Sequence, residues 1–197
     1  MSTSLILVVI IVAVAISFDF INGFHDAANS IATVVATRVL TPFWAVVWAA
    51  AFNFIAAFIA GTGVARMVGN GMVALSYVTP YVILAGLIGA ITWDLITWWW
   101  GLPSSSTHAL LGGYAGAAMA HVAYLRGISS SFDALIANGW TKTLISIILA
   151  PLLGMALAYL LMVLLYWVFQ KATPTRMDAW FRVLQLGSSA ALSFSHG

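Results

Sequence analysis

Residues 143–170 read TLISIILAPLLGMALAYLLMVLLYWVFQ, a run of 28 residues between Lys142 and Lys171 that carries no charge. About 20 apolar residues are enough to cross the hydrocarbon core of a bilayer as a helix. Lipid offers no hydrogen-bond partner to the backbone, so a spanning segment has to satisfy its own polar groups, which favours a helix. The sequence around this run therefore predicts a membrane-spanning helix.

The composition of the whole chain agrees with that prediction. Hydrophobic residues make up 63% of the 197 residues and charged residues 6%, with a mean hydropathy of +1.05. A soluble globular protein carries roughly 25% charged residues, so a water-soluble fold is excluded. The formal charge of +2 comes from very few groups and does not indicate nucleic-acid binding. With no cysteine, disulfides, thiolate metal sites and cysteine nucleophiles are excluded as well.

Long uncharged runs elsewhere predict an all-α integral membrane protein with several spans. The basic residues do not separate onto one side of these spans, so the positive-inside rule assigns no orientation. We expect helices near 4–20, 26–40, 43–65, 73–100, 103–125 and 143–170.

The first polar interruption of this pattern is residues 22–29, NGFHDAAN. Gly23 permits a bend, and a helix that restarts at about His25 would place Asp26 and Asn29 on one face. A carboxylate inside a membrane costs at least ~2.5 kcal/mol and is usually paired, hydrated or functional. The pattern predicts a broken helix whose new N-terminus attracts an anion while Asp26 binds a cation. The alternative is that Asp26 only caps a helix near the interface.

The second interruption is residues 101–108, GLPSSSTH, which we expect to open a helix with Pro103 in its first turn. Ser104 to Thr107 offer four hydroxyls beside unpaired backbone N–H groups, a set that can hold an oxyanion. A plain capped helix is the alternative. His108 could shuttle protons near neutral pH or simply pack through a hydrogen bond.

Three further features give weaker predictions. Asp19 is expected to face the cavity of the first motif or to lie at a hydrated edge, and Asp94 is expected at the membrane interface among tryptophans. Gly112 and Gly116 predict a small-residue face for close helix packing.

A short internal repeat predicts how the chain is divided. The motif FING at 20–23 recurs loosely as FSHG at 194–197, each time after an apolar run rich in small residues. Transporters are often built from two repeats that meet at a midplane site. We therefore expect residues 1–175 to form a first transporter repeat, with its broken helix at 22–29 and its helix start at 103–108. Residues 176–197 would be the truncated start of a second repeat.

These motifs resemble those of a known family. Residues 23–29, GFHDAAN, resemble the GANDVAN signature of the PiT family of inorganic phosphate transporters, and residues 101–108 resemble its second signature, GLPxSTTH or GLPASSSH. Residues 194–197 look like the lead-in to that family's second GAND motif. His25 stands where the signature has Asn, which resembles the bacterial low-affinity branch, where GFHDTAN is common.

The resemblance implies an inverted-repeat transporter rather than an enzyme, in a bacterial inner membrane, with phosphate between two repeats. It also implies coupling to H⁺ or Na⁺, transport of phosphate as a metal–phosphate complex in this branch, and no further cofactor. Its expected partners are inorganic phosphate, membrane lipid, the second half of the transporter and a second copy in a homodimer, with no nucleic acid. Carried over by position, the phosphate contacts would be Asn29, Ser105, Ser106 and Thr107, the site of the coupling proton or Na⁺ would be Asp26, and the accessory residues would be Asn22, His25 and His108.

Other functions remain open from the residues alone. A sulfate permease of the same fold would use the same hydroxyls and amides. An intramembrane serine hydrolase would need Ser105, His108 and Asp26, but Ser105 and His108 lie one turn apart on one helix and no G-x-S-x-G elbow is present. A membrane scaffold would need no buried Asp. With half of the site absent, we expect that the chain alone does not transport unless it self-assembles.

Overall fold

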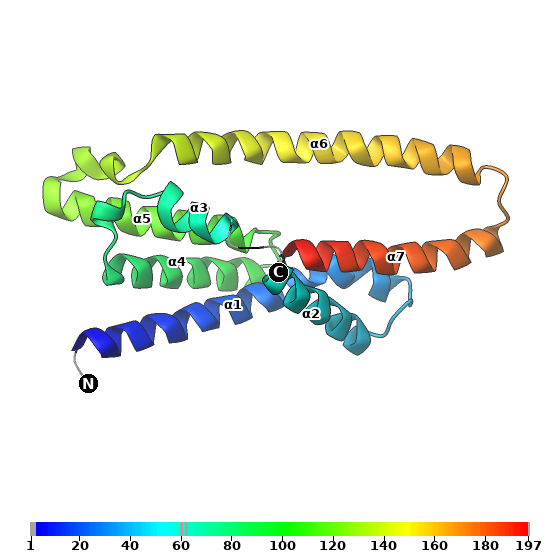
Figure 1. Cartoon of the computed structure of the whole chain (residues 1–197), viewed down its shortest axis with the longest axis horizontal. Helices are drawn as coiled ribbons and strands as arrows, with labels where there is room; N and C mark the ends of the chain where they lie inside the picture. The colour runs from blue at the N-terminus through cyan, green and yellow to red at the C-terminus, as the bar shows by residue number, and fades with distance from the viewer. Residues whose placement is uncertain (1–2, 60, 62, 197) are drawn as a thin grey trace. The chain divides into compact units, whose positions relative to one another are not determined.

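A computed structural model describes residues 3–59, 61 and 63–196 of the chain (Figure 1). The described part is helical, apart from turns and one isolated bridge between Val73 and Leu135. Its elements, in chain order, are α1 (Thr3–Ala36), α2 (Pro42–Ile59), α3 (Gly63–Gly71), η1 (Leu75–Tyr77), α4 (Pro80–Trp99), α5 (Ser106–Arg126), η2 (Ile128–Ala134), α6 (Ala137–Phe169) and α7 (Pro174–His196).

Four helices of the described part are long and apolar enough to cross a membrane: α1, α2, α4 and α6. The predicted spans at 43–65 and 73–100 are shorter in the structure, because α2 ends at Ile59 and α4 begins at Pro80. The predicted span at 143–170 corresponds to α6, which begins at Ala137 and tolerates Pro151 in its interior. Helix α5 has the length of a span, but its serine, glycine and histidine residues make it less apolar.

The helix break expected at 22–29 is wrong for this structure. Helix α1 is helical from Thr3 to Ala36, so the predicted helices at 4–20 and 26–40 are one element. Gly23 costs a helix only about 1 kcal/mol relative to alanine. A break in apolar surroundings would leave backbone groups unpaired at several kcal/mol each, and no proline removes a donor in this stretch. The continuous helix is therefore the less costly solution.

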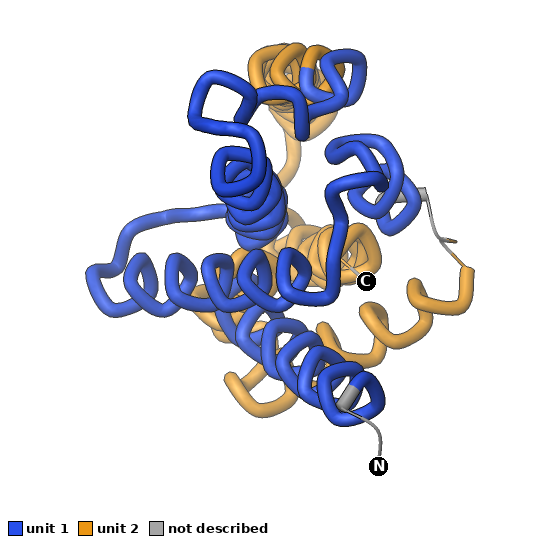
Figure 2. Tube along the Cα trace, turned by 90° about the vertical axis from the view of Figure 1, so that its left-hand side faces the viewer, with its two compact units in different colours: residues 1–26, 62–140 blue, residues 27–61, 141–197 orange. Residues whose placement is uncertain are grey.

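The chain packs as two compact units, coloured separately in Figure 2. The first unit holds residues 1–26 and 62–140, and the second holds 27–61 and 141–197. The boundary in the N-terminal part falls inside α1, between Asp26 and Ala27. The predicted division into residues 1–175 and 176–197 concerns sequence repeats rather than packing and stays a prediction.

The first unit is built on close packing of α4 against α5. A Cβ atom on Gly113 would collide with the carbonyl oxygen of Gly86, and one on Gly86 would lie 2.9 Å from the Cα of Tyr114. By contrast, a Cβ on Gly112 or Gly116 would meet nothing within 4 Å. The glycine of α5 that touches α4 is therefore Gly113, and the packing face expected at Gly112 and Gly116 stays a prediction.

Hydrogen bonds fix the end of this hairpin at which α4 begins and α5 ends. The Thr79 side chain caps α4 by accepting the N–H of Val82 at 3.3 Å, and Pro80 occupies the first turn. At the far end of α5, the Arg126 guanidinium donates to the Tyr77 hydroxyl at 2.7 Å and lies over its ring. These contacts hold the loop before α4 against the end of α5.

The second unit packs α2 against α7 through small side chains. Ala45, Ala49 and Ala56 of α2 are buried, as are Ser189 and Ser193 of α7. Small residues let two helix backbones approach closely, which is the usual basis of helix pairing in lipid. Helix α7 contains residues 176–196 of the segment expected to open a second repeat, and Gly197 lies outside the described residues.

Candidate substrate and ion site

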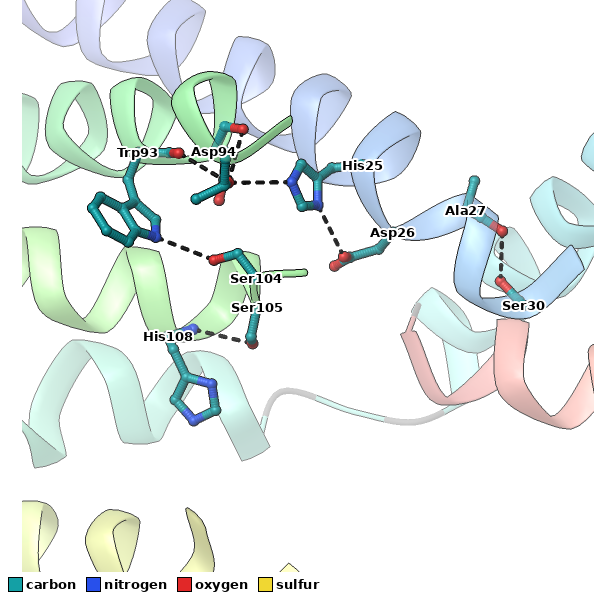
Figure 3. A network of polar contacts seen from close by, with 10 residues as sticks. His25, Asp26, Ala27, Ser30, Trp93, Asp94, Ser104, Ser105 and His108 are labelled. Carbon is teal, nitrogen blue, oxygen red and sulfur yellow. Dashed lines mark hydrogen bonds and ion pairs between the residues drawn. The ribbon is translucent and has the colours of Figure 1, made fainter. Parts of the chain in front are cut away.

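Polar side chains of the first unit gather where α1, α4 and the start of α5 approach one another. Trp93 on α4 donates its indole N–H to the hydroxyl of Ser104, just before α5, at 3.1 Å (Figure 3). This bond fixes the short connection between α4 and α5. The turn following Trp99 brings the serine-rich segment back to the side of the helix that precedes it.

His25 links α1 to α4. Its Nδ1 lies 3.5 Å from Asp26 Oδ1, and its Nε2 lies 3.4 Å from Thr97 Oγ1 (Figure 3). The Thr97 hydroxyl itself donates to the backbone carbonyls of Trp93 at 3.0 Å and Asp94 at 3.1 Å. Since its only hydrogen is committed to those carbonyls, Thr97 can offer only a lone pair to His25. The structure therefore places two of the predicted residues, His25 and Asp26, in one polar network.

Asp94 lies inside the protein, so its expected place at the membrane interface is wrong. Its side chain is 0% exposed, and neither carboxylate oxygen has a hydrogen-bond partner in the described structure. The hydroxyl of Ser106, at the start of α5, is equally buried and lies close enough to Asp94 to act on its carboxylate, although the two make no hydrogen bond of good geometry. The burial has a sequence signal: Asp94 follows Gly86, Leu87 and Ala90 on the stripe of α4 that packs inside the unit.

The four consecutive hydroxyls before and at the start of α5 do not share one environment. The helix start predicted there is confirmed, but Pro103 precedes it and the N-cap is Ser105, which accepts the backbone N–H of His108 at 3.4 Å. Ser106 is buried beside Asp94, whereas Thr107 is exposed. One helical turn thus sends neighbouring hydroxyls in different directions.

A groove of about 360 Å³ runs along the α4–α5 hairpin on the side of Ser105. His108 lines it, and small residues on both helices keep it open. The full lining is Gly89, Trp93, Ser104, Ser105, His108, Ala109, Gly112 and Gly113. Hydroxyl and imidazole groups beside a helix N-terminus suit an anion.

The remaining predicted residues lie outside this network. Asn29 is exposed and belongs to the part of α1 in the second unit, while Asn22 is half-buried in the first. Asp19 is exposed on α1. Within the described residues, no three His, Cys, Asp or Glu side chains are grouped to hold a metal ion, so Na⁺ at Asp26 stays a prediction.

Comparison with known proteins identifies the family. Residues 22–197 match the family described as "Phosphate transporter family". The chain belongs to this family. The PiT resemblance of the motifs is thereby confirmed, and the chain is a multi-pass membrane protein of a transporter family rather than an enzyme.

Individual relatives give the same picture. The chain is 48% identical to a "Probable low-affinity inorganic phosphate transporter" of Rhizobium meliloti (strain 1021), over 97% of this chain and 55% of that protein. It is 45% identical to a protein of the same description from Streptomyces halstedii, over 98% of this chain and 87% of that one. It is 34% identical to "Low-affinity inorganic phosphate transporter PitB" of Escherichia coli (strain K12), over 98% of this chain and 43% of PitB.

A solved structure supports the fold. The protein titled "The sodium-dependent phosphate transporter" superimposes with a TM-score of 0.69 at 23% identity, covering 94% of this chain and 54% of that one. The expected all-α transporter fold is thereby confirmed. The chain spans about half the length of this protein and of the Rhizobium relative.

Proposed function

We propose that the chain forms one repeat of a secondary active transporter that carries inorganic phosphate across a bacterial inner membrane, coupled to H⁺ or Na⁺. The observation that carries this proposal is the His25–Asp26 pair in the same packed unit as the serine-rich N-terminus of α5. A carboxylate suits the coupling ion, and a helix N-terminus with free hydroxyls suits the oxyanion.

The proposed roles follow the family signatures and the groove. Ser105, at the groove, and Thr107, exposed in the first turn of α5, supply hydroxyls to phosphate, with Asn29 and Ser106 as the other proposed contacts. Asp26 binds the coupling ion. The accessory residues are Asn22, His25 and His108. Phosphate travelling as a neutral metal–phosphate complex would need no fixed positive charge from the protein, and none of the groove residues is lysine or arginine.

We further propose that transport needs a second repeat. The chain spans 55% of its Rhizobium relative, and transporters of this kind bind substrate between repeats. A second copy of the chain in a homodimer would be the other way to complete the site, and lipid would surround either assembly.

The test is labelled phosphate uptake by proteoliposomes. We expect no saturable uptake by the monomeric chain, and saturable uptake by a chimera in which the chain replaces the matching 55% of the Rhizobium relative. An imposed proton or sodium gradient identifies the coupling ion. Excess sulfate serves as competitor: uptake abolished by sulfate would keep the architecture and change the substrate, and an inactive chimera of correct fold would contradict the proposal.

A further inference from the structure

Asp94 and Ser106 form a buried polar pair that the roles proposed above leave unexplained. Both side chains are 0% exposed, and the two carboxylate oxygens and the hydroxyl oxygen all lack a hydrogen-bond partner of good geometry. A buried polar group without a partner destabilises the folded protein, and a charged one does so more strongly. Even if the Ser106 hydroxyl turns its hydrogen toward one carboxylate oxygen, an ionised Asp94 keeps the other oxygen without a donor and carries its charge at 0% exposure.

The charges around this pair do not balance if every aspartate is ionised. The groups that act on Asp94 from α1 are His25 and Asp26, and the group from α5 is the uncharged Ser106. His25 lies between Asp94 and Asp26 in Figure 3, and its Nδ1 is directed at Asp26. Its Nε2 faces Thr97, which can only accept. The one imidazole contacts Asp26 directly and also acts on Asp94, so two carboxylates share at most one positive charge.

We propose that Asp94 is a proton-binding site, separate from Asp26, in which the protonated carboxyl donates its hydrogen to Ser106 Oγ. One proton removes the uncompensated negative charge and joins two of the unpartnered oxygens in a hydrogen bond. A neutral Asp94 beside an ion pair of His25 with Asp26 leaves the cluster without net charge, the arrangement that a low-dielectric interior favours.

A metal ion fits the same place less well. Asp94 and Ser106 supply three oxygens, and the Thr97 hydroxyl is already used by backbone carbonyls. No group of three His, Cys, Asp or Glu side chains able to hold a metal occurs among residues 3–59, 61 and 63–196. A proton needs neither a full coordination shell nor a cavity of its own.

The consequence for transport rests on the proposed function. Thr97 bonds to the carbonyl of Asp94 and contacts His25, so a change in the charge of either carboxylate acts on the same network. By reciprocity, a proton on Asp94 removes one of the negative charges that attract the coupling ion to Asp26, so the two sites are coupled through their charges.

The test is infrared spectroscopy of the 197-residue chain in lipid nanodiscs, which does not depend on transport. The chain has five aspartates and no glutamate, so labelling aspartate with ¹³C isolates a small set of carboxyl bands. We expect the carbonyl band of a protonated carboxyl at neutral pH that Asp94→Asn removes. Ser106→Ala should move this band to higher frequency without removing it, because the hydrogen bond is lost. Asp19→Asn and Asp133→Asn, at exposed positions, should leave that band in place.

Three results would overturn the proposal. They are a spectrum without a band that Asp94→Asn removes, a band that Ser106→Ala leaves unmoved, and a band that added Na⁺ abolishes at constant pH.

Circular dichroism checks that each variant is helical, and Ser106→Ala keeps the test decisive if Asp94→Asn does not fold. Phosphate uptake by the chimera is measured separately. An inactive chimera with the expected bands would refute the proposed function alone, and an active one without them would refute the proton site alone.

Discussion

Phosphate uptake by the chimera is expected to fall on the order of 100-fold when Asp26 is replaced by Asn. The substitution keeps the shape of the side chain and removes the charge that pairs with His25 Nδ1 at 3.5 Å. A carboxylate inside a membrane costs about 2.5–3.5 kcal/mol and is kept where it binds an opposite charge, so the interaction with the coupling ion is lost with the carboxylate. Initial rates of labelled phosphate uptake in proteoliposomes measure the effect.

Asp133→Asn is the matched control, because Asp133 lies in the same unit but is exposed on η2. It should transport at the unsubstituted rate. The Asp26→Asn and Asp133→Asn variants should melt at similar temperatures. The side chain of Asp26 is partly exposed, and the neutral asparagine that replaces it needs no counter-ion. Unchanged uptake in a folded Asp26→Asn protein would remove Asp26 from the coupling site.

Much of the fold follows from the length of uncharged sequence. The run between Lys142 and Lys171 predicted α6 to within a few residues at its C-terminal end, because no charge interrupts it and lipid leaves the backbone no alternative to a helix. The serine-rich start of α5 was also predicted, because a helix N-terminus needs side-chain acceptors. These are local properties, which a single sequence carries.

The predictions that were wrong concern features that depend on packing between segments distant in the sequence. The NGFHDAAN motif looked like a break because glycine and polar residues weaken an isolated helix, yet α1 continues through it. Asp94 looked interfacial beside its tryptophans. Its burial depends on α5 folding back to present Ser106, and on α1 supplying His25. Composition within α4 alone does not reveal either neighbour.

Gly113→Ala is expected to destabilise the chain by about 1–3 kcal/mol, the usual cost of forcing extra volume into a tight contact. Its Cβ would collide with the Gly86 carbonyl oxygen and lie 3.1 Å from the backbone nitrogen of Ala90. Since these are backbone atoms, no side-chain rotation relieves the contact, and α4 has to move away from α5. The midpoint of unfolding in detergent, followed by circular dichroism, measures the loss.

Gly112→Ala supplies the control one residue away on the same helix. Its Cβ would meet nothing within 4 Å, and alanine favours a helix over glycine by up to about 1 kcal/mol. The two alanine variants therefore have the same composition, and their expected changes in stability have opposite signs.

Equal destabilisation by both would mean that added volume on α5, rather than the close contact of Gly113 with Gly86, limits the packing. Destabilisation by Gly112→Ala alone would support the face expected from the Gly112–Gly116 spacing. A loss confined to Gly113→Ala would assign the α4–α5 contact, and with it the closeness of Asp94 to Ser106, to one glycine pair.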